Sequence, residues 1–327
     1  MLGPERTDDK VADILNRVVE WELWYEADPR HVEKMLNDME LGECKESVVP
    51  GTKTNEQEDD NEQLDVEYAK RYRSVVARGN FLAQDRPDIR YSVKELCREM
   101  SSPSRGSWRR LKKLCRYLKG TPRVVQKVKI GADLNNVVDV YVDSDWAGCT
   151  RTRRSTNGGC ILLNRACLKT WSTTQTVVAR SSGEAEYYAA VKGAAEGMAV
   201  QSMLADLGLK VTIEVHTDSS ACRGICNRRG LGKLRHLDVA ALLWLQQRVQ
   251  SGKTILRRIA GSVNPADLFT KHLARAEIIM HSGRLGFCSV SGRATQVDTA
   301  HVELLAAGVL LFHSAEGKCE PWRHNSS

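Results

Sequence analysis

The chain lacks any apolar run long enough to cross a membrane. Its longest hydrophobic stretch, Leu304 to Phe312, falls far short of the roughly 20 residues that span a bilayer. The charged segment after Met1 is not followed by the apolar core of a signal peptide. The sequence therefore predicts a soluble, intracellular protein without membrane contact.

The chain also lacks closely spaced cysteine pairs, because its ten cysteines are scattered and no Cys-x-x-Cys occurs. Cys222 and Cys226 lie four apart on a predicted helix, but no His or Cys pair nearby in sequence completes a zinc site. This pattern favours reduced, buried thiols over a disulfide framework or a zinc domain.

The composition fits a folded protein with room for two domains. The chain has 327 residues, of which 42% are hydrophobic and 27% are charged. A net charge of +7 favours an anionic partner without identifying one.

The first part of the chain predicts helices on either side of a polar linker. Residues 1–50 predict helix, strand and helix, residues 51–67 form an acidic linker, and residues 68–122 predict three helices. The last of these, Trp108 to Leu118, has one apolar face and one face of Arg and Lys. That basic face is either solvated surface or a contact for phosphates.

From about residue 123 the pattern changes to short strands separated by turn residues. The element order from Val137 is β-β-β, α, β, α, α, β, α, which predicts a mixed sheet flanked by helices, of the α/β class. Residues 124–130 belong either to this sheet or to the preceding connection. Residues 276–327 lose periodicity and predict a weakly ordered tail. In the long helix that opens at Ser181, we expect a buried stripe of Tyr188, Val191, Ala195, Ala199 and Met203.

Four acids, Asp143, Glu186, Asp218 and Asp267, stand where a predicted strand ends or a helix begins. If the strands before Asp143 and Asp218 are neighbours, their carboxylates converge at one edge of the sheet. Hard oxygen donors without His or Cys suit Mg²⁺ or Mn²⁺. Two such ions about 4 Å apart promote hydrolysis of a phosphodiester. Taken singly, each acid is more often a turn former or a partner of a helix dipole.

Seven motifs in order, over about 130 residues, resemble the ribonuclease H domain of copia-type retrotransposon Pol polyproteins. They are Tyr141-Val-Asp-Ser-Asp-Trp-Ala-Gly148, Arg154-Ser-Thr-Asn-Gly158, Trp171-Ser172, Ser181-Ser-Gly-Glu-Ala-Glu-Tyr187, His216-Thr-Asp-Ser-Ser-Ala221, Arg235-His-Leu-Asp-Val239 and Asn264-Pro-Ala-Asp-Leu-Phe-Thr-Lys271.

Upstream, Tyr72-Arg-Ser-Val-Val76, Arg86-Pro-Asp-Ile89 and Trp108 to Gly120 resemble the end of the reverse transcriptase of the same family. The resemblance implies an RNase H-like fold over residues 123–275, preceded by a mainly helical thumb and connection at 68–122 and a reverse-transcriptase remnant at 1–50. It implies a ribonuclease rather than a polymerase, with the rest of the Pol polyprotein as a partner. The expected location is the cytoplasm, in a virus-like particle, or the nucleus.

The resemblance assigns Asp143, Glu186, Asp218 and Asp267 as the acids that bind two Mg²⁺ ions, with Mn²⁺ as a substitute, and cut RNA paired to DNA. Asp145 and Glu184 share the first two acidic motifs and are the alternatives, although a turn role and a helix-capping role suit them better.

A hybrid duplex is recognised through its phosphates, groove shape and 2′-hydroxyls. The residues expected to contact it are Arg154, Ser182, Ser219, Arg228, Arg229, Lys233 and Arg235. Trp146 and Trp171 are either core residues or platforms on which bases stack, and we expect them in the core. The alternative function is a catalytically silent relic of a retroelement that only binds nucleic acid.

Overall fold

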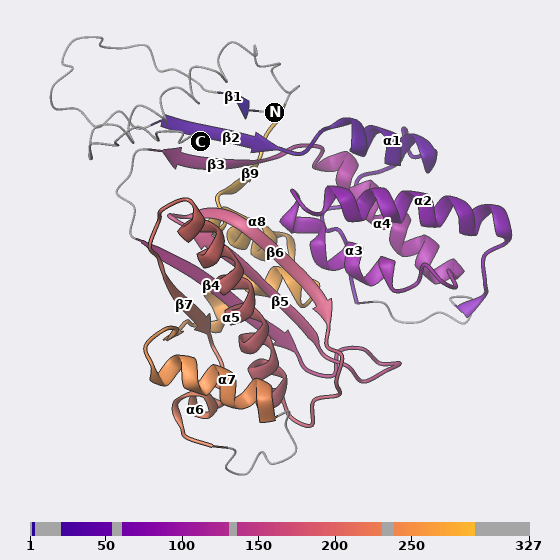
Figure 1. The fold of residues 1–327 in the computed structure, drawn as a ribbon. Helices are drawn as coiled ribbons and strands as arrows, with labels where there is room; N and C mark the ends of the chain where they lie inside the picture. Colours follow the sequence, from indigo (N-terminus) through magenta and orange to yellow (C-terminus); the bar gives the residue numbers. More distant parts are fainter. Residues whose placement is uncertain (1, 4–20, 54–60, 131–135, 231–238, 292–327) are drawn as a thin grey trace, which may run out of the picture.

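The computed structural model describes residues 2–3, 21–53, 61–130, 136–230 and 239–291 (Figure 1). They form a helical part, a five-stranded sheet with helices packed on it, and a second sheet of four strands. Within these ranges, no helix is both long and apolar enough to cross a bilayer.

The five-stranded sheet has the strand order β6-β5-β4-β7-β8. Its strands are β4 (Val137–Asp145), β5 (Thr156–Leu163), β6 (Ala166–Thr174), β7 (Thr212–Thr217) and β8 (Ile255–Arg258). The neighbours β4 and β7 run parallel, as do β7 and β8, whereas β5 and β6 are antiparallel to their neighbours. The predicted α/β class with a mixed sheet is confirmed.

Helix α5 (Ser182–Asp206) covers one face of this sheet, next to α6 (Ser220–Asn227) and α7 (Val239–Gln250) (Figure 1). The prediction of which α5 residues are buried is wrong, because Met203 is 52% exposed while Gly193, Gly197 and Val200 are buried. A Cβ at Gly193 would lie 2.4 Å from Val142 Cγ1. The helix therefore packs against the sheet through small residues, which a hydrophobicity pattern undervalues.

The opposite face of the sheet is covered by η4 (Pro265–Phe269) and α8 (Arg275–Arg284). Phe269, Ile278 and Leu285 pack there against Cys160 and Leu162 of β5. The expectation of a weakly ordered tail from residue 276 is therefore wrong up to residue 291, because these few apolar residues pack against the sheet. Residues 292–327 of that predicted tail lie outside the described residues.

The four-stranded sheet is antiparallel, in the order β1-β2-β3-β9. Its strands are β1 (Leu2–Gly3), β2 (Trp21–Glu26), β3 (Val124–Ile130) and β9 (Phe287–Ser289). Residues 124–130 thus form a strand, but not one of the five-stranded sheet. Segments far apart in the sequence meet here, so the chain crosses this sheet before and after the RNase H-like motifs.

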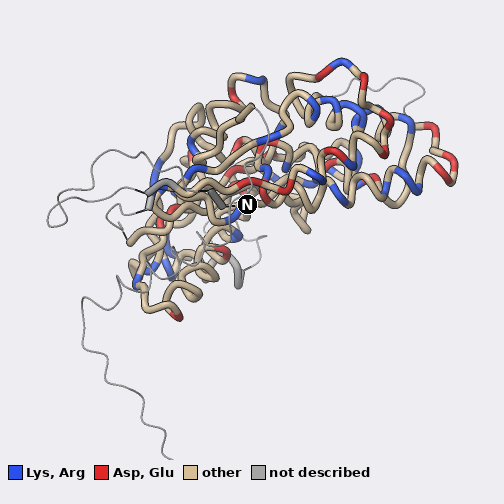
Figure 2. The backbone as a smooth tube through the Cα atoms, turned by 90° about the horizontal axis from the view of Figure 1, so that it is seen from above, with Lys and Arg blue, Asp and Glu red and all other residues tan. Residues whose placement is uncertain are grey.

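The helical part consists of α1 (Arg30–Asp38), α2 (Val66–Leu82), η2 (Pro87–Ile89), α3 (Arg90–Cys97) and α4 (Arg105–Gly120). Met35, Tyr72, Leu111 and Leu118 are fully buried in its core. Figure 2 shows basic and acidic residues interspersed along these helices.

Part of the basic face of α4 has a structural role. Lys119 Nζ donates to Cys44 O at 2.9 Å, Lys113 Nζ donates to Thr52 Oγ1 at 3.0 Å, and Arg116 donates to Lys45 O. These side chains hold the segment between α1 and the linker against α4.

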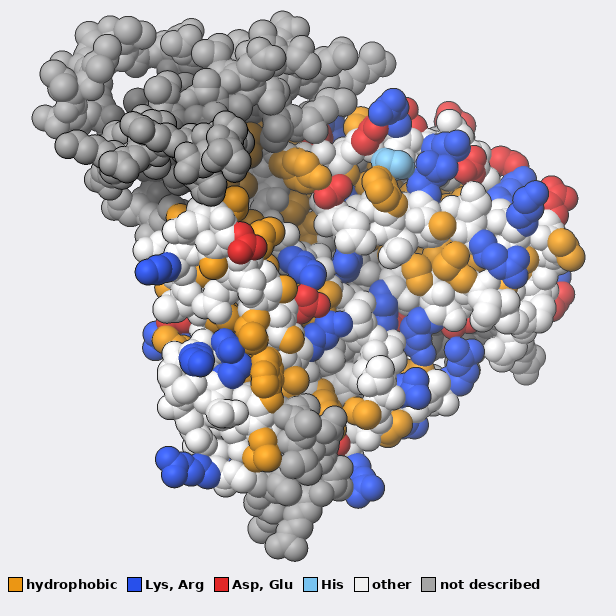
Figure 3. Space-filling view, in the orientation of Figure 1, with side chains coloured by type: hydrophobic (Ala, Val, Ile, Leu, Met, Phe, Trp, Pro, Cys, Tyr) orange, Lys and Arg blue, Asp and Glu red, His pale blue; other side chains and the backbone are white. Residues whose placement is uncertain are grey.

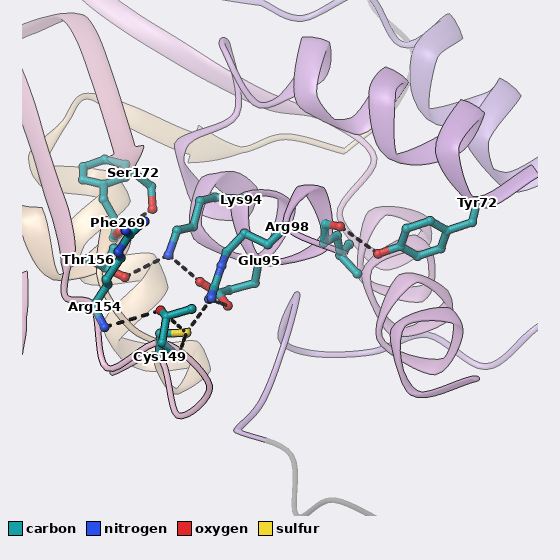
Figure 4. Close-up of polar contacts among 11 residues, drawn as sticks. Tyr72, Lys94, Glu95, Arg98, Cys149, Arg154, Thr156, Ser172 and Phe269 are labelled. Carbon is teal, nitrogen blue, oxygen red and sulfur yellow. Dashed lines mark hydrogen bonds and ion pairs between the residues drawn. The ribbon is translucent and has the colours of Figure 1, made fainter. Parts of the chain in front are cut away.

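Helix α3 joins the helical part to the five-stranded sheet through polar contacts (Figure 4). Lys94 Nζ donates to Thr156 Oγ1 at 2.8 Å, and Arg98 Nη2 lies 2.6 Å from Cys149 Sγ. Burial acts to raise the pKa of the Cys149 thiol, but hydrogen bonds from Thr152 and Arg98 outweigh it and lower this pKa to about 7. The loop between β4 and β5 is therefore fixed against α3.

Candidate metal centre

Asp143 lies on β4 opposite Gly158 of β5, two residues before the strand ends at Asp145. Its carboxylate is buried and accepts a hydrogen bond from the Thr270 hydroxyl. Gly158 makes this approach possible, because a Cβ there would lie 2.5 Å from Thr270 Cγ2. Because Asp143 pairs with a glycine, its carboxylate can contact the segment that contains Asp267 and Thr270.

Glu186 lies on the buried side of α5, in the row that continues through Ala190, Gly193 and Gly197 to the sheet. Its Oε1 accepts hydrogen bonds from Ser144, from the backbone N–H at 3.2 Å and from Oγ at 3.0 Å. Its Oε2 is buried and has no hydrogen-bond partner among the described residues. Burial, and then the charges of Asp143 and Asp218, raise the pKa of Glu186 to about 8.

Asp218 directly follows β7, the parallel neighbour of β4. Burial and then Asp143 raise the pKa of its carboxyl. Asp143, Glu186 and Asp218 each offer a carboxylate oxygen, and these three oxygens all lie within 4.8 Å of one another. The structure therefore brings together three of the four predicted acids from two strands and a helix.

Asp267 lies on η4 and is not a member of that compact group. Burial and then Asp143 raise the pKa of Asp267 to about 7, while Lys271, whose Nζ is 2.9 Å from Asp267 Oδ2, acts to lower it. Asn264 fixes η4 to the sheet, because its Nδ2 donates to Val142 O at 3.0 Å. The fourth acid thus approaches Asp143 from η4, on the face of the sheet opposite α5.

These oxygens fit a divalent cation that prefers hard ligands. Buried carboxylate oxygens normally have a hydrogen-bond partner, and Glu186 Oε2 finds none in the part of the chain that the structure describes. A cation bound by Asp143, Glu186 and Asp218 would satisfy that oxygen and reverse the upward shifts in the pKa values of Glu186 and Asp218. An oxygen-only ligand set favours Mg²⁺ or Mn²⁺ over Zn²⁺.

A second cluster of possible ligand atoms consists of Asp139, Glu214 and His216. Unlike Glu186, these side chains already have polar partners. Glu214 accepts two hydrogen bonds from Arg257, at 2.7 and 2.8 Å, and His216 Nε2 lies 2.8 Å from Asp139 Oδ1. Its members are already paired with one another or with Arg257, so the unpartnered oxygen distinguishes the Asp143 site.

Comparison with known proteins identifies the family. No family model matches the chain. It is 31% identical over 222 residues, 67% of its length, to the Retrovirus-related Pol polyprotein from transposon RE2 of Arabidopsis thaliana. It is 36% identical over 168 residues to an uncharacterized mitochondrial protein of the same plant, of which it covers 68%.

The chain belongs to the copia-type retrotransposon Pol family. It is also 29% identical over 192 residues to the Retrovirus-related Pol polyprotein from transposon TNT 1-94 of Nicotiana tabacum. This Pol chain spans only 15% of the RE2 polyprotein and 14% of the TNT 1-94 polyprotein. It therefore corresponds to one region of each of these two longer polyproteins.

Two solved structures are also similar to the Pol chain. A crystal structure of LC11-RNase H1 in complex with an RNA/DNA hybrid has 14% sequence identity and a TM-score of 0.30, and covers 41% of this chain and 93% of that one. An N-terminal RNase H domain from Mycobacterium tuberculosis has 17% identity and a TM-score of 0.29, and covers 42% of this chain and 91% of that one. The sheet of the Pol chain has the strand order β6-β5-β4-β7-β8, with α5 on one face.

The two alternative acids of the Pol chain lie at the start of α5 and at the end of β4. Glu184 accepts a hydrogen bond from the Arg180 backbone N–H at 2.9 Å, and its own N–H donates to Ser181 Oγ at 3.2 Å, at the start of α5. Asp145 ends β4, and its Oδ2 lies where a Cβ on Gly148 would approach within 1.8 Å. Both side chains lie outside the compact group of three acids.

The predicted nucleic-acid contacts are only partly described. Arg154, Ser182 and Arg229 are exposed. Ser219 caps α6, since its Oγ accepts a hydrogen bond from the Cys222 N–H at 3.1 Å, and Arg228 is half-buried after the same helix. Lys233 and Arg235 lie outside the described residues.

Three residues that touch the acids were not predicted: Ser144, Thr270 and Lys271. Thr270 and Lys271 belong to the motif that contains Asp267. The motif therefore marked this segment as important, but it did not reveal that these two side chains contact the acids. Trp146 was expected in the core and is instead 47% exposed, whereas Trp171 is buried as expected. The turn after Asp145 directs the Trp146 indole outward, which the sequence pattern did not reveal.

Proposed function

We propose that this Pol region is a ribonuclease H that hydrolyses the RNA strand of an RNA–DNA hybrid with two divalent metal ions. The observation that carries the proposal is the buried, unpartnered Glu186 Oε2 beside Asp143 and Asp218 in the described part of the chain. A buried oxygen without a hydrogen-bond partner destabilises the fold, so a protein that only binds nucleic acid has no use for one. Binding of a cation to this oxygen would compensate for that cost.

The acids have distinct positions in this proposal. Asp143 is central, since its charge acts on Glu186, Asp218 and Asp267. It would contact both ions, with Glu186 and Asp218 completing one site and Asp267 the other. Bound there, Mg²⁺ or Mn²⁺ would activate a water molecule and stabilise the leaving oxygen.

Two hydroxyls of the Pol chain hold these acids in place. Ser144 Oγ donates to Glu186 Oε1 at 3.0 Å, and the Thr270 hydroxyl donates to Asp143. Each hydrogen bond fixes a carboxylate rotamer, so the oxygens are arranged before a cation binds. The proposed products are an RNA 3′-hydroxyl and a 5′-phosphate.

The charge distribution supports a nucleic-acid substrate. Figure 3 shows basic side chains on both sides of the boundary between the helical part and the five-stranded sheet, with fewer acidic ones on that face. We assign Arg154, Ser182, Ser219, Arg228 and Arg229, together with Lys233 and Arg235, to contacts with the hybrid backbone. The helical part would be the thumb and connection of the reverse transcriptase, and the rest of the polyprotein would supply the polymerase.

A labelled RNA–DNA hybrid incubated with the chain and Mg²⁺ tests this function. We expect endonucleolytic cuts in the RNA strand alone, which EDTA and the Asp143→Asn substitution abolish. Failure of the parent chain to cleave, or equal cleavage by the Asp143→Asn chain, would overturn the proposal. Salt-dependent binding of the hybrid without any cleavage would instead support a nucleic-acid-binding relic.

A further inference from the structure

Trp146 is held rigidly while much of its ring faces solvent. Its Nε1 donates a hydrogen bond to Ala179 O at 3.0 Å, and the side chain is 47% exposed. The polar edge of the indole is therefore used inside the protein, and the exposed part is apolar ring. One exposed tryptophan alone indicates little, because apolar side chains are common on protein surfaces.

The loop that carries Trp146 is built to keep this orientation. The Ala147 N–H donates to Ser155 Oγ at 3.1 Å, and the Arg153 N–H donates to Cys149 O at 2.7 Å. Ala147 has a φ of 53°, a left-handed conformation that costs energy in any residue with a Cβ. Further contacts from Arg98 to Cys149 fix the loop against α3.

A second segment brings more exposed apolar surface to the same place. Val177 and Val178 are 41% and 53% exposed, and they immediately precede Ala179, the residue that binds the Trp146 indole. Two separate loops, one after β4 and one before α5, thus carry exposed apolar side chains and are joined by the Trp146–Ala179 hydrogen bond.

The charges of these two loops have a single sign. Arg151, Arg153 and Arg154 are exposed on the first loop, and Arg180 is exposed beside Ala179 on the second. Residues 146–156 and 175–183 contain no Asp or Glu. A fixed aromatic ring on loops that carry only basic charges is complementary to a nucleic-acid strand, whose phosphates attract the guanidinium groups and whose flat bases and sugars pack on the ring.

This surface flanks the proposed metal centre. Trp146 follows Asp143 by three residues, and Arg180 donates its backbone N–H to Glu184, two residues before Glu186. Each loop is thus connected to an acid of the proposed metal centre by only a few residues.

We propose that Trp146, Val178, Arg151, Arg153, Arg154 and Arg180 form a docking surface for one strand of the RNA–DNA hybrid beside the cleavage point. The indole packs on the sugars and base edges, and the arginines contact the phosphates. This inference rests on the proposed function for its ligand, but it concerns binding and is tested without cleavage.

The test measures hybrid binding by fluorescence anisotropy in EDTA with the Asp143→Asn chain as parent. We expect Trp146→Ala to weaken binding on the order of tenfold, with the salt dependence unchanged, since the ring carries no charge. Trp146→Phe should keep most of the affinity. Met203→Ala removes an equally exposed apolar side chain at the far end of α5 and should bind like the parent.

A separate double variant tests the docking surface even if the Trp146→Ala chain does not fold. The Arg153→Ala, Arg180→Ala double variant should lower the slope of log affinity against log salt by roughly 1 to 2, because each lost phosphate contact removes about 0.9. Unchanged affinity for Trp146→Ala, an unchanged slope for the double variant, or a parent that binds no hybrid would each overturn the docking surface. A chain that binds hybrid through Trp146 but never cleaves it would leave the docking surface standing and remove only the nuclease.

Discussion

Lys271 Nζ lies 2.9 Å from Asp267 Oδ2, so the fourth acid of the candidate site already has a positive partner. The charges of Asp143 and Asp218 also act on this ammonium group and, against the effect of burial, raise the pKa of Lys271. Lys271 therefore neutralises part of the acid cluster from within the same motif that supplies Asp267.

This pairing predicts competition between Lys271 and a divalent cation. Replacing Lys271 with Met should increase the affinity for Mn²⁺, measured by calorimetry without substrate, on the order of fivefold, because the cation no longer displaces an ion pair. The matched control is Lys169→Met, which removes a partly exposed pair with Glu196 outside the site and should leave Mn²⁺ affinity unchanged. Weaker Mn²⁺ binding by Lys271→Met would show that Lys271 supports the site instead.

The raised pKa of Glu186 predicts how stability depends on pH without metal. The folded protein keeps a proton on Glu186 up to a pKa of about 8, whereas the unfolded chain loses it near the ordinary value of 4.5. The folded state binds more protons between these values, so stability should fall as pH rises through this window. Thermal melts in EDTA at pH 5 and pH 8 measure the fall, and Glu186→Gln should flatten it. An equally steep fall in Glu186→Gln would contradict the assignment.

The contact between Thr270 and Asp143 predicts a specific pair of substitutions. Thr270→Val removes the hydroxyl at nearly constant volume and should lower the cleavage rate about tenfold, because the Asp143 carboxylate loses a charge-assisted hydrogen bond. Thr270→Ser keeps the hydroxyl and should retain most activity. Steady-state cleavage of the hybrid in Mg²⁺ distinguishes the two, and equal rates for both would argue against this positioning role.

The close packing of α5 on the sheet predicts a large effect at one glycine and the opposite effect at another. A Cβ at Gly193 would lie 2.4 Å from Val142 Cγ1, so Gly193→Ala should destabilise the protein by about 1–3 kcal/mol. A Cβ at Gly224 on α6 would point into open space, with no packing neighbour within 4 Å among the described residues, so Gly224→Ala should stabilise by about 0.5–1 kcal/mol. Urea denaturation measures both, and similar values for the two would contradict this packing.

Local signals in the sequence predicted most of the elements and the α/β class, whereas the meeting of the acids was predicted only if the strands before Asp143 and Asp218 are neighbours. The β-rich run before Asp143 and the capping pattern at Ser181 each mark a local element, and the strand before Asp218 proved to be the neighbour of β4. Such signals depend on residues adjacent in the chain, which is why they could be read from one sequence.

Features that depend on tertiary packing were not predictable. The buried face of α5 contains Gly193 and Gly197, which contribute little hydrophobicity of their own. Because they lack a side chain, they allow valine and isoleucine side chains of the sheet to pack close to the helix. The segment containing α8 and β9 has weak periodicity, yet Ile278 and Phe287 find partners far away in the sequence. The Lys271–Asp267 pair and the exposure of Trp146 likewise became visible only in three dimensions.

The most direct test of the central claim compares matched acids in the hybrid-cleavage assay with Mg²⁺. Asp143→Asn and Glu186→Gln should lower the cleavage rate by at least roughly a thousandfold, whereas Asp145→Asn and Glu184→Gln should stay within about tenfold of the parent. Losses that are equal within each pair, or larger for Asp145 and Glu184, would contradict the account that Asp143, Glu186 and Asp218 form the metal centre.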